Sequence, residues 1–552
     1  MRGDENTTTF SMGNHENVHP FLEEILTKAI IPIVFLFAGL WTIWLRPRLE
    51  RRKPHPSIPM LPNSHWLFGH LFWLIKHGFL EKQQVLVDCA DEKGRSCTWM
   101  GPIRSISLTT PEDARELLWK FHSRNNVPIL KYHFERLMGP KNLFMMNGKE
   151  WKYYQSALRT ALSRLDPFIL QTITKETTRK LTENIKAKIA DSIDTKSIEI
   201  PSIQSLMKMI TMDVFGRTAF SHDFECCSKL ELCAFAKAYE FMEKDIMDRC
   251  TKRTLMPQNL FYWIPTARNS KFNQYRSLAR GELQSILRDR RTSIGRANDI
   301  VSKILEAHAK AASSTNDDGK PSNPTLSEDD LIDLLFSLQL AGFETVSTAL
   351  TYAIFLLNRN PDWEALCLEE IQAVTLHSKS NMDEFDLPIC RGAIMEALRI
   401  FPVATASNRI LEKDFEFKDG VTIPKGCFVG VSFWLIHRCE RNFPKPMEFR
   451  PDRWIPKPNS SAYKSACPHG RSIGDIPAGD TNSFFAFSGG SRSCPGQHYA
   501  LREATVVLAW LIKDLKFEID PGFELEIEWK AVVQGPKGGI PARVYTRPQS
   551  ID

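Results

Sequence analysis

The sequence lacks several features that mark common classes of binding and redox proteins. Its twelve cysteines form no C-x-x-C pair and no regular disulfide frame, a pattern that fits reduced thiols facing the cytosol. No Gly-rich dinucleotide fingerprint follows a strand, and no Walker loop is present. The net charge is only +6, and no basic stripe is interleaved with aromatic residues, which argues against binding to nucleic acid. No internal repeat is found, which argues against a repeat architecture.

The chain has enough apolar residues for a large core. It has 552 residues, of which 43% are hydrophobic, so one large domain or several are possible. The pattern predicts a mainly α fold with small β-sheets. We expect a strand at 103–108, a helix that begins at Thr110 and Pro111, a fully buried helix at 331–357 and a hairpin at 415–431 that turns at 419–420.

The most informative segment is a loop that reads Phe-Ser-Gly-Gly-Ser-Arg-Ser-Cys-Pro-Gly. Its spacing, F-x-x-G-x-R-x-C-x-G, suits a loop that holds the sulfur of Cys494 against a haem iron. The helical run at 499–511 would stabilise a thiolate through its dipole. Gly490 permits a tight turn, Phe487 can pack under the ring, and Arg492 can bind a haem propionate. The alternative is an ordinary loop cysteine, but the full spacing is hard to meet by chance.

The apolar helix at 331–357 carries a polar pair at its centre, Glu344 and Thr345. Polar groups there are costly without a purpose. We predict that Thr345 and Glu344 deliver protons during oxygen activation and that Gly342 leaves room for oxygen and substrate. The alternative is a structural threonine whose hydroxyl bonds to the carbonyl one turn earlier.

A third pattern places Glu396 and Arg399 one helical turn apart. Arg453 follows in a Pro-bounded segment about fifty residues later. We predict a buried network of these three side chains, which would fix one packing arrangement. On its own, the Glu-Arg pair is also compatible with a surface helix.

These segments, in this order, resemble the cytochrome P-450 superfamily of haem-thiolate monooxygenases, and the resemblance covers residues 54–547. It implies the P-450 fold with haem b between the helix at 331–357 and the helix after Cys494. The resemblance also implies roles for the matching residues, which are the proximal ligand Cys494 as the metal site, the oxygen-activating pair Glu344 and Thr345, the structural triad Glu396, Arg399 and Arg453, and the haem contacts Phe487, Gly490, Arg492, Arg409 and Trp151.

The chain departs from the family pattern at two places. Gln155 stands where the family often has an arginine, so propionate binding would rest on Trp151 or move to Arg159. Val346 stands after the threonine, where many relatives have a second hydroxyl. The proton relay then has one hydroxyl fewer, or Ser347 assists. A surface insertion is expected at 456–482, with no assignable role.

The N-terminus predicts a single membrane anchor. Residues 29–45 carry no charge and, at about 1.5 Å per residue, nearly span a hydrocarbon core of roughly 30 Å. Basic residues follow at once, so the catalytic domain is expected to be cytosolic at the endoplasmic reticulum membrane. The predicted divisions are a lumenal tail at 1–28, the transmembrane helix at 29–45, a basic and Pro-rich linker at 46–62 and the catalytic domain at 63–552. A cleaved signal peptide and a buried core helix are the alternatives.

The expected activity is insertion of one oxygen atom of O2 into a lipophilic substrate while the other atom is reduced to water. With no flavin domain expected after about Arg547, the resemblance implies electrons from NADPH through a separate flavoprotein, the NADPH-cytochrome P-450 reductase, with cytochrome b5 as a second candidate donor. Exposed basic residues, Lys149, Lys152 and Arg159, are candidates for the docking face. A P-450-like isomerase or dehydratase, or a non-catalytic haem sensor or carrier, are alternatives.

Fatty acid hydroxylation ranks first, because the cysteine loop and residues 434–438 look most like relatives that hydroxylate fatty acids. Sterols or other isoprenoids rank second. An aromatic and Met-rich region before the central helix either lines the access channel or is plain core. Its members are Phe235, Phe241, Met242, Met247, Leu255, Met256, Leu260, Phe261, Tyr262 and Trp263.

Overall fold

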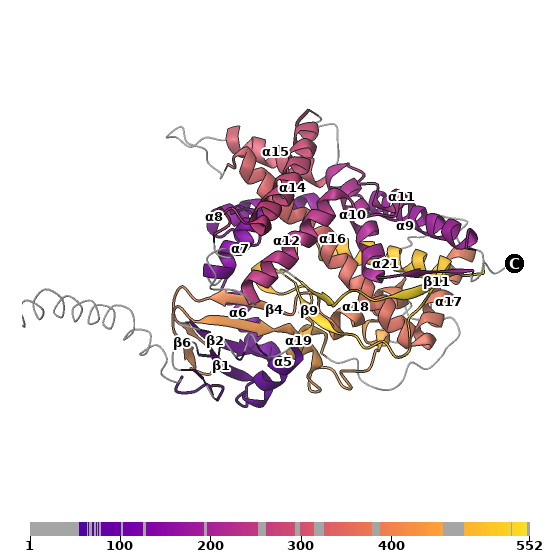
Figure 1. Cartoon of the computed structure of the whole chain (residues 1–552). Helices are drawn as coiled ribbons and strands as arrows, with labels where there is room; N and C mark the ends of the chain where they lie inside the picture. The colour runs from indigo at the N-terminus through magenta and orange to yellow at the C-terminus, as the bar shows by residue number, and fades with distance from the viewer. Residues whose placement is uncertain are drawn as a thin grey trace, which may run out of the picture.

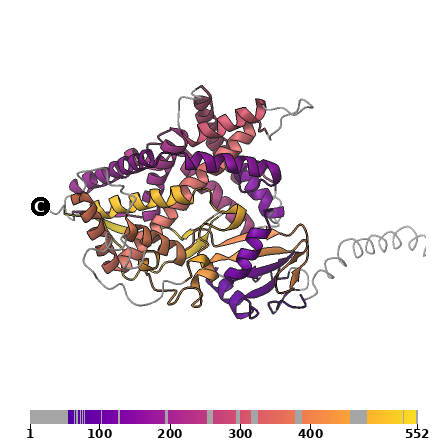
Figure 2. The same ribbon diagram turned by 180° about the vertical axis from the view of Figure 1, so that it is seen from behind.

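The architecture is mainly helical with four small sheets, as the sequence predicts. The computed structural model describes residues 55–548 apart from 63, 66–68, 71–72, 74–75, 77–78, 101–102, 125–127, 193–195, 252–260, 293–298, 314–324, 378–386, 456–479 and 531–532. In Figure 1 the largest sheet lies at the lower left, α14 and α15 lie at the top, and α16 runs through the middle. Figure 2 shows from behind that the largest sheet lies at one corner, at the lower right, and that helices form most of the remainder.

The described helices cover most of the chain. They are α5 (Phe79–Asp88), α6 (Pro111–Lys120), α7 (Pro128–Met138), α8 (Gly148–Ser163), α9 (Pro167–Ala190), α10 (Ile203–Phe220), α11 (Cys226–Lys229), α12 (Ala234–Thr251), α14 (Ala267–Thr292), α15 (Ile300–Ser313), α16 (Glu328–Arg359), α17 (Pro361–His377), α18 (Pro388–Ile400), α19 (Phe433–Arg438) and α21 (Gln497–Asp514), with short 3-10 turns η4 (Pro451–Trp454), η5 (Thr481–Ser483) and η6 (Gly490–Arg492).

The strands are short and pair mostly antiparallel. The largest sheet has the order β1 (Arg95–Met100), β2 (Ile103–Leu108), β7 (Phe428–Ser432), β4 (Ala406–Ile410). The others are β3 (Ser197–Ile200) with β11 (Ala542–Thr546) and β8 (Leu515–Glu518), β9 (Ile527–Trp529) with β10 (Gln534–Pro536), and β5 (Phe415–Glu416) with β6 (Thr422–Ile423). In the largest sheet β2 runs parallel to β7, while Arg409 of β4 lies opposite Val429 of β7.

The hairpin expected at 415–431 is only partly correct. Its tip forms as predicted, since β5 pairs with β6 and Gly420 has φ +83°, a conformation that glycine adopts without strain. The second arm was assigned wrongly, because β7 leaves the hairpin and pairs with β2 and β4. Pairing with β2, a strand distant in sequence, therefore determines the position of β7, and the local turn does not.

Helix α16 is the buried helix that the sequence predicts. Its start is fixed by a capping box, in which the Ser327 hydroxyl accepts from the Asp330 backbone N–H and the Asp330 carboxylate accepts from the Ser327 N–H. Every residue from 331 to 357 is buried except Ala341 and Thr345. Helices α10, α14, α18 and α21 all pack against it, so it sits at the centre of the core.

Within the described residues, α16 is also the single helix long and apolar enough to cross a membrane, and 89% of its most apolar window is buried inside the protein. It is therefore a core helix. The predicted anchor at 29–45 and nearly all of the insertion expected at 456–482 lie outside the described residues.

Candidate active site

The loop before Cys494 is a compact turn fastened by its own backbone. The Cys494 N–H donates to the Phe487 carbonyl at 2.9 Å, and the Ser493 N–H donates to the Gly490 carbonyl at 3.1 Å. Gly490 has φ +66°, and a Cβ there would lie 2.1 Å from the carbonyl oxygen of Leu118. Glycine is thus required both by conformation and by space.

Helix α8 holds this loop from the side. The Gln155 amide donates to the Ser491 carbonyl at 2.8 Å, and the Arg159 guanidinium donates to the Ser493 carbonyl at 3.1 Å and its hydroxyl at 3.0 Å. The structure therefore gives Gln155 and Arg159 contacts with the cysteine loop itself. Gln155 and Arg159 follow Trp151 by one and two helical turns, and this spacing was the available sequence signal.

The Cys494 side chain is exposed, although protein surrounds it closely enough that burial raises the pKa of its thiol while the Gly496 N–H and the charge of Arg159 lower it. The sulfur is therefore accessible while neighbouring protein atoms partly desolvate it. Such a thiol becomes a thiolate when it binds a metal ion, since the cation outweighs the desolvation.

Arginine side chains gather near this loop without a counter-charge. Arg492 donates to the Met146 carbonyl at 2.8 Å, and its guanidinium lies 3.7 Å from the Trp151 ring centroid. Arg409 is buried and donates through Nη1 to the Ser407 hydroxyl at 2.9 Å, but its Nε and Nη2 have no hydrogen-bond partner among the described residues. Burial and the charges of Arg124 and Arg492 lower the pKa of Arg409 to about 9.

This cluster fits the propionates of a haem. No ion pair joins Arg124, Arg409 or Arg492 to an acid in the part of the chain that the structure describes. Buried cations need an anion, and the unpartnered nitrogens of Arg409 are free to bind one. Arg124, whose pKa burial also lowers, was missed at the sequence level because no motif marks it.

On α16 the structure gives Gly342 a different role from the one predicted. A Cβ at Gly342 would lie 2.2 Å from the ring of Phe215 on α10, so the glycine allows close helix packing rather than room for oxygen. The Thr345 hydroxyl donates to the Ala341 carbonyl at 2.7 Å, which was the structural alternative. Ala341 and Thr345 remain partly exposed on this otherwise buried helix, so both residues lie on a face that solvent reaches. Ser347 points elsewhere, and its hydroxyl donates to the Glu344 carbonyl at 3.0 Å.

Glu344 lies in a buried ionic cluster that the motif did not reveal. Its carboxylate is 3.0 Å from the Lys208 ammonium on α10 and 3.6 Å from the Lys530 ammonium after β9. Burial raises the pKa of Glu344, but the two lysines outweigh burial and lower it. Lys208 lies in a helix of which nearly every residue is buried, and the sequence alone did not mark it as a partner of Glu344.

A second buried carboxyl, Glu243 on α12, belongs to the same cluster. It accepts a hydrogen bond from the Tyr239 hydroxyl at 2.6 Å. Burial and then the charge of Glu344 raise the pKa of Glu243 to about 7. The cluster therefore combines a fixed carboxylate, Glu344, with a carboxyl that titrates near neutral pH.

Replacing Glu243 with glutamine should stabilise the protein above neutral pH. Between its ordinary pKa of 4.5 and about 7 the folded carboxyl keeps a proton that the unfolded chain has released, so wild-type stability falls as pH rises through this window. The difference of about 2.5 between these pKa values corresponds to about 3 kcal/mol of unfolding free energy. The wild type loses this free energy as the pH rises, and the glutamine variant should not.

Urea unfolding at pH 5 and pH 8 measures this effect. Glu240→Gln is the matched control, because Glu240 also bonds to Lys208, at 2.8 Å, but is partly exposed. If both variants changed the pH dependence of the unfolding free energy equally, Glu243 would have no special role.

The predicted network on α18 is assembled in the structure. Arg399 donates to both oxygens of Glu396, at 2.8 and 2.9 Å, and the Arg453 Nε donates to Glu396 at 3.2 Å. The Trp454 indole N–H and the Arg450 backbone N–H add two further donors at 2.9 and 3.1 Å. All three predicted side chains are fully buried, so a charge at the centre is completely surrounded by donors.

The aromatic region before α16 divides into core and surface. Phe235, Met242 and Tyr262 are core residues, so the alternative of plain core holds for them. Phe241 and Met247 are partly buried, and Phe261 and Trp263 are exposed. Leu255, Met256 and Leu260 lie outside the described residues.

A cysteine loop that leads into a buried helix, beside a cluster of arginines without counter-charge, is the arrangement of a haem-thiolate protein. The comparisons with known proteins agree. The family model for cytochrome P450 matches residues 59–541, so the chain belongs to the cytochrome P450 family and is a cytochrome P450 monooxygenase. A non-catalytic haem carrier is therefore not supported.

Individual relatives are distant. "Cytochrome P450 72A68" of Medicago truncatula is 26% identical over 77% of this chain and 76% of its own length. "Cytochrome P450 4A12" of Rattus norvegicus is 24% identical over 95% of this chain and 96% of its own. A solved structure, "Crystal structure of cytochrome P450DA heme domain", has a TM-score of 0.68 at 19% identity and covers 89% of this chain and 98% of that one. The last shows the fold alone.

Proposed function

We propose that this monooxygenase hydroxylates a lipophilic substrate, with fatty acids as the first candidate class. One observation carries the proposal, namely the partial exposure of Ala341 and Thr345 on a helix that is otherwise buried from 331 to 357. The two partly exposed side chains are the methyl group of Ala341 and the side chain of Thr345, so this face offers a single hydroxyl. Such a surface favours an apolar substrate and places a single proton-carrying group beside it.

In this proposal Cys494 would hold the haem iron through its sulfur, and Arg409, Arg492 and Arg124 would bind the propionates, with Trp151 beside Arg492. The haem supplies activation of dioxygen when it is bound. Thr345 holds a proton at its hydroxyl oxygen, where the bond to the Ala341 carbonyl fixes its orientation. Glu344 is held by Lys208 and Lys530, so it stays ionised and can accept and return protons only when this ion pair loosens.

Thr345→Ala should uncouple the reaction. We expect haem and substrate binding to persist, while product formed per NADPH falls roughly tenfold or more because proton delivery loses its directed donor. Product, hydrogen peroxide and NADPH are measured together. Thr351→Ala is the matched control, since the Thr351 hydroxyl makes the same bond to a carbonyl one turn earlier, at 2.7 Å, but is buried. Tight coupling in Thr345→Ala would rule out the proposed role.

Electrons reach this family through a redox partner. For this chain we propose NADPH-cytochrome P-450 reductase, with cytochrome b5 as a second donor. What supports a docking face is the exposure of Lys149, Lys152 and Arg159 on α8, together with the contact of Arg159 to the cysteine loop. We further propose single-pass anchoring in the endoplasmic reticulum membrane through residues 29–45, with the catalytic domain in the cytosol.

The substrate class is tested by titration. Fatty acids and sterols are added separately to the ferric protein, and the low-to-high-spin shift and turnover with reductase are followed. A shift and hydroxylated product with fatty acids support the proposal, and a response to sterols or other isoprenoids alone moves the assignment to that class. A small polar compound that responds when neither lipid class does would overturn it. Turnover of a peroxide without reductase would instead favour isomerase or dehydratase chemistry.

A further inference from the structure

Two cysteines lie side by side where α11 leads into α12. Cys226 is the first residue of α11, and Cys233 directly precedes α12. The Cys233 N–H donates to the Cys226 sulfur at 3.3 Å, so this sulfur lies within about 4.8 Å of the Cys233 Cα. Both thiols are free, and Cys233 is partly exposed while Cys226 is buried. The pair is therefore close enough to form a disulfide after a small rotation of the side chains.

The two thiols differ in acidity. Hydrogen bonding with the Cys226 thiol lowers the pKa of Cys233, and burial opposes this shift. The backbone N–H groups of Ala236 and Phe235, at the start of α12, lower it further. The same contact with Cys233, followed by burial, raises the pKa of Cys226. Because a thiolate at a helix N-terminus is stabilised by the helix dipole, Cys233 is the nucleophile of the pair and Cys226 keeps its proton.

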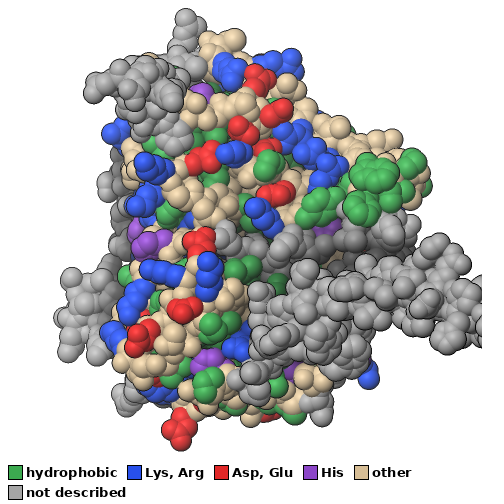
Figure 3. Space-filling view, turned by 90° about the vertical axis from the view of Figure 1, so that its left-hand side faces the viewer, with side chains coloured by type: hydrophobic (Ala, Val, Ile, Leu, Met, Phe, Trp, Pro, Cys, Tyr) green, Lys and Arg blue, Asp and Glu red, His purple; other side chains and the backbone are tan. Residues whose placement is uncertain are grey.

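The surface beside Cys233 carries balanced charge. Glu225 pairs with Lys229 at 2.7 Å, and Glu231 pairs with Lys237. These four side chains are exposed, and together they leave no net charge. Figure 3 shows a similar mixing of Lys and Arg with Asp and Glu on the face at the left of Figure 1. A thiolate in such surroundings does not attract an ionic partner, so the fitting reagent is small and neutral, as hydrogen peroxide is.

Helix α11 is itself fixed to the core. The N–H groups of Cys226 and Cys227 donate to the two carboxylate oxygens of Asp213 on α10, at 2.9 and 2.8 Å. Helix α11 also packs against α9 and α10, and all three lie together in Figure 1. A bond between the two sulfurs would therefore tie the start of α12 to an immobile part of the fold.

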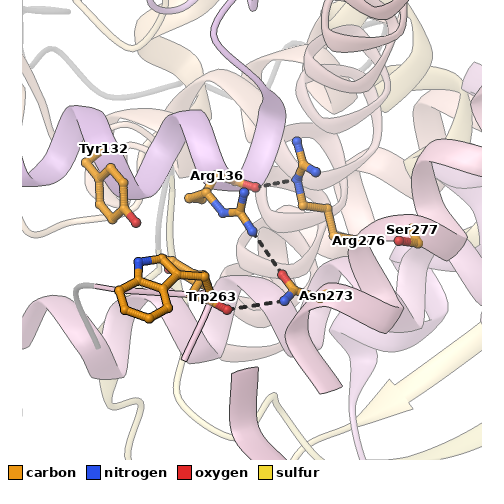
Figure 4. A pocket seen from close by; sticks show the side chains of 7 residues that line it. Tyr132, Arg136, Trp263, Asn273, Arg276 and Ser277 are labelled. Atoms are coloured by element: carbon orange, nitrogen blue, oxygen red, sulfur yellow. Dashed lines mark hydrogen bonds between the residues drawn. The ribbon is translucent and has the colours of Figure 1, made fainter. Parts of the chain in front are cut away.

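The far end of α12 is held by two other helices. There Arg249 donates to the Asn269 side-chain oxygen of α14 at 2.7 Å, and α12 packs against both α14 and α7. Figure 4 shows that α14 is in turn joined to α7, since Arg136 donates to Asn273 at 2.9 Å and Arg276 donates to the Arg136 carbonyl at 2.9 Å. A disulfide at Cys233 would thus fasten the second end of α12.

We propose that Cys233 and Cys226 form a modification site at which hydrogen peroxide reversibly oxidises the pair to a disulfide. The Cys233 thiolate attacks one oxygen of the peroxide, the O–O bond breaks, and the departing hydroxide takes up the proton that Cys233 had released, which leaves a sulfenic acid. The Cys226 thiol then attacks the Cys233 sulfur. The S–S bond forms, the S–O bond breaks, and the Cys226 proton leaves with the oxygen as water. Two thiols lose two electrons in total, and one peroxide becomes two waters.

Oxidation at this site acts on a helix that carries part of the buried ionic cluster. Tyr239 and Glu243 both belong to α12 and are joined at 2.6 Å. With its start bonded to α11, α12 has less freedom to open locally, so its first amides should exchange more slowly with solvent. The pair therefore links the peroxide level to the rigidity of α12.

The experiment uses the full-length haem protein, first reduced and then treated with a small excess of hydrogen peroxide, with and without dimedone to trap sulfenic acid. Remaining thiols are alkylated, and the peptides are identified by mass spectrometry before and after reduction. Cys226→Ser removes the second thiol and Cys233→Ser removes the nucleophile. Cys227→Ser is the matched control, because Cys227 is the buried neighbour of Cys226 in α11 but is not a member of the pair. The reduced carbon monoxide spectrum confirms the haem site in each variant.

We expect the wild type and Cys227→Ser to form the disulfide between Cys226 and Cys233, and dithiothreitol to reverse it. In Cys226→Ser the sulfenic acid at Cys233 has no thiol to react with, so its dimedone labelling should rise about tenfold above the wild type. In Cys233→Ser, Cys226 should stay unlabelled because it keeps its proton. Amide hydrogen exchange at residues 234–240 should slow in the oxidised wild type and stay unchanged in α15.

Three results would overturn the proposal. One is dimedone on Cys226 in Cys233→Ser, and another is a Cys233 that reacts with peroxide no faster than Cys89, a partly exposed cysteine after α5. The third is a disulfide that leaves hydrogen exchange at residues 234–240 unchanged. None of these readouts depends on turnover, so the result is separate from the proposed substrate class.

Discussion

Cys494→Ser is expected to abolish the thiolate-specific band of the reduced carbon monoxide complex together with all turnover. The serine hydroxyl is the same shape but is not ionised near neutral pH, so it cannot give electron density to the iron as a thiolate does. The backbone of the loop should persist, because its bonds from the Cys494 and Ser493 N–H groups involve no sulfur. The spectrum and product formation with reductase measure the two losses.

Cys439→Ser is the matched control, since Cys439 is a partly buried cysteine at the end of α19. It should retain both the band and the activity. Gly490→Ala tests the loop instead of the sulfur, because a Cβ would meet the Leu118 carbonyl, and it should lower haem content. A Cys494→Ser protein that keeps the band would assign the ligand to another residue.

Glu396→Ala is expected to prevent stable folding with haem. The change leaves Arg399 and Arg453 buried without their carboxylate and removes five hydrogen bonds. Breaking a buried ion pair costs about 3–5 kcal/mol, a large part of the roughly 5–15 kcal/mol that holds a typical domain folded. Urea unfolding and haem content per protein are the measurements.

Glu448→Ala is the control in the same region. Glu448 pairs with Lys445 at 2.9 Å, but both side chains are about half exposed, so its loss should cost at most about 1 kcal/mol. Glu396→Gln keeps an acceptor oxygen, so its loss of unfolding free energy should lie between the losses of the two alanine variants. If Glu396→Ala unfolds no more easily than Glu448→Ala, the network does not stabilise this fold.

Local patterns of the sequence predicted several of the helices and strands. The apolar run at 331–357 predicted α16, because burial on all faces is a property of one segment. The pattern at 103–108 likewise predicted β2. The hairpin at 415–431 failed in its second arm, because β7 pairs with β2, which lies more than three hundred residues earlier.

In the candidate site, too, the sequence predicted some residues and missed others. Spacing selected Cys494 and Gly490 as candidates, because they lie in one short segment, and together with Arg453 it predicted the network of Glu396 and Arg399. Lys208 and Lys530 beside Glu344, and Arg124 beside Arg409, could not be predicted, because each pair comes from elements distant in sequence. A charge in a sequence reveals nothing of its burial or its partner.

The sequence by itself therefore determined the class of chemistry, through a cysteine loop whose turn and helix start are local. The tertiary structure alone decided how that chemistry is controlled. It brought Phe215 against Gly342, placed two lysines beside Glu344 and gathered Arg124 and Arg492 near Arg409. The physical reason is that backbone turns and caps depend on neighbours in the chain, whereas desolvation and charge pairing depend on which distant side chains share a buried volume.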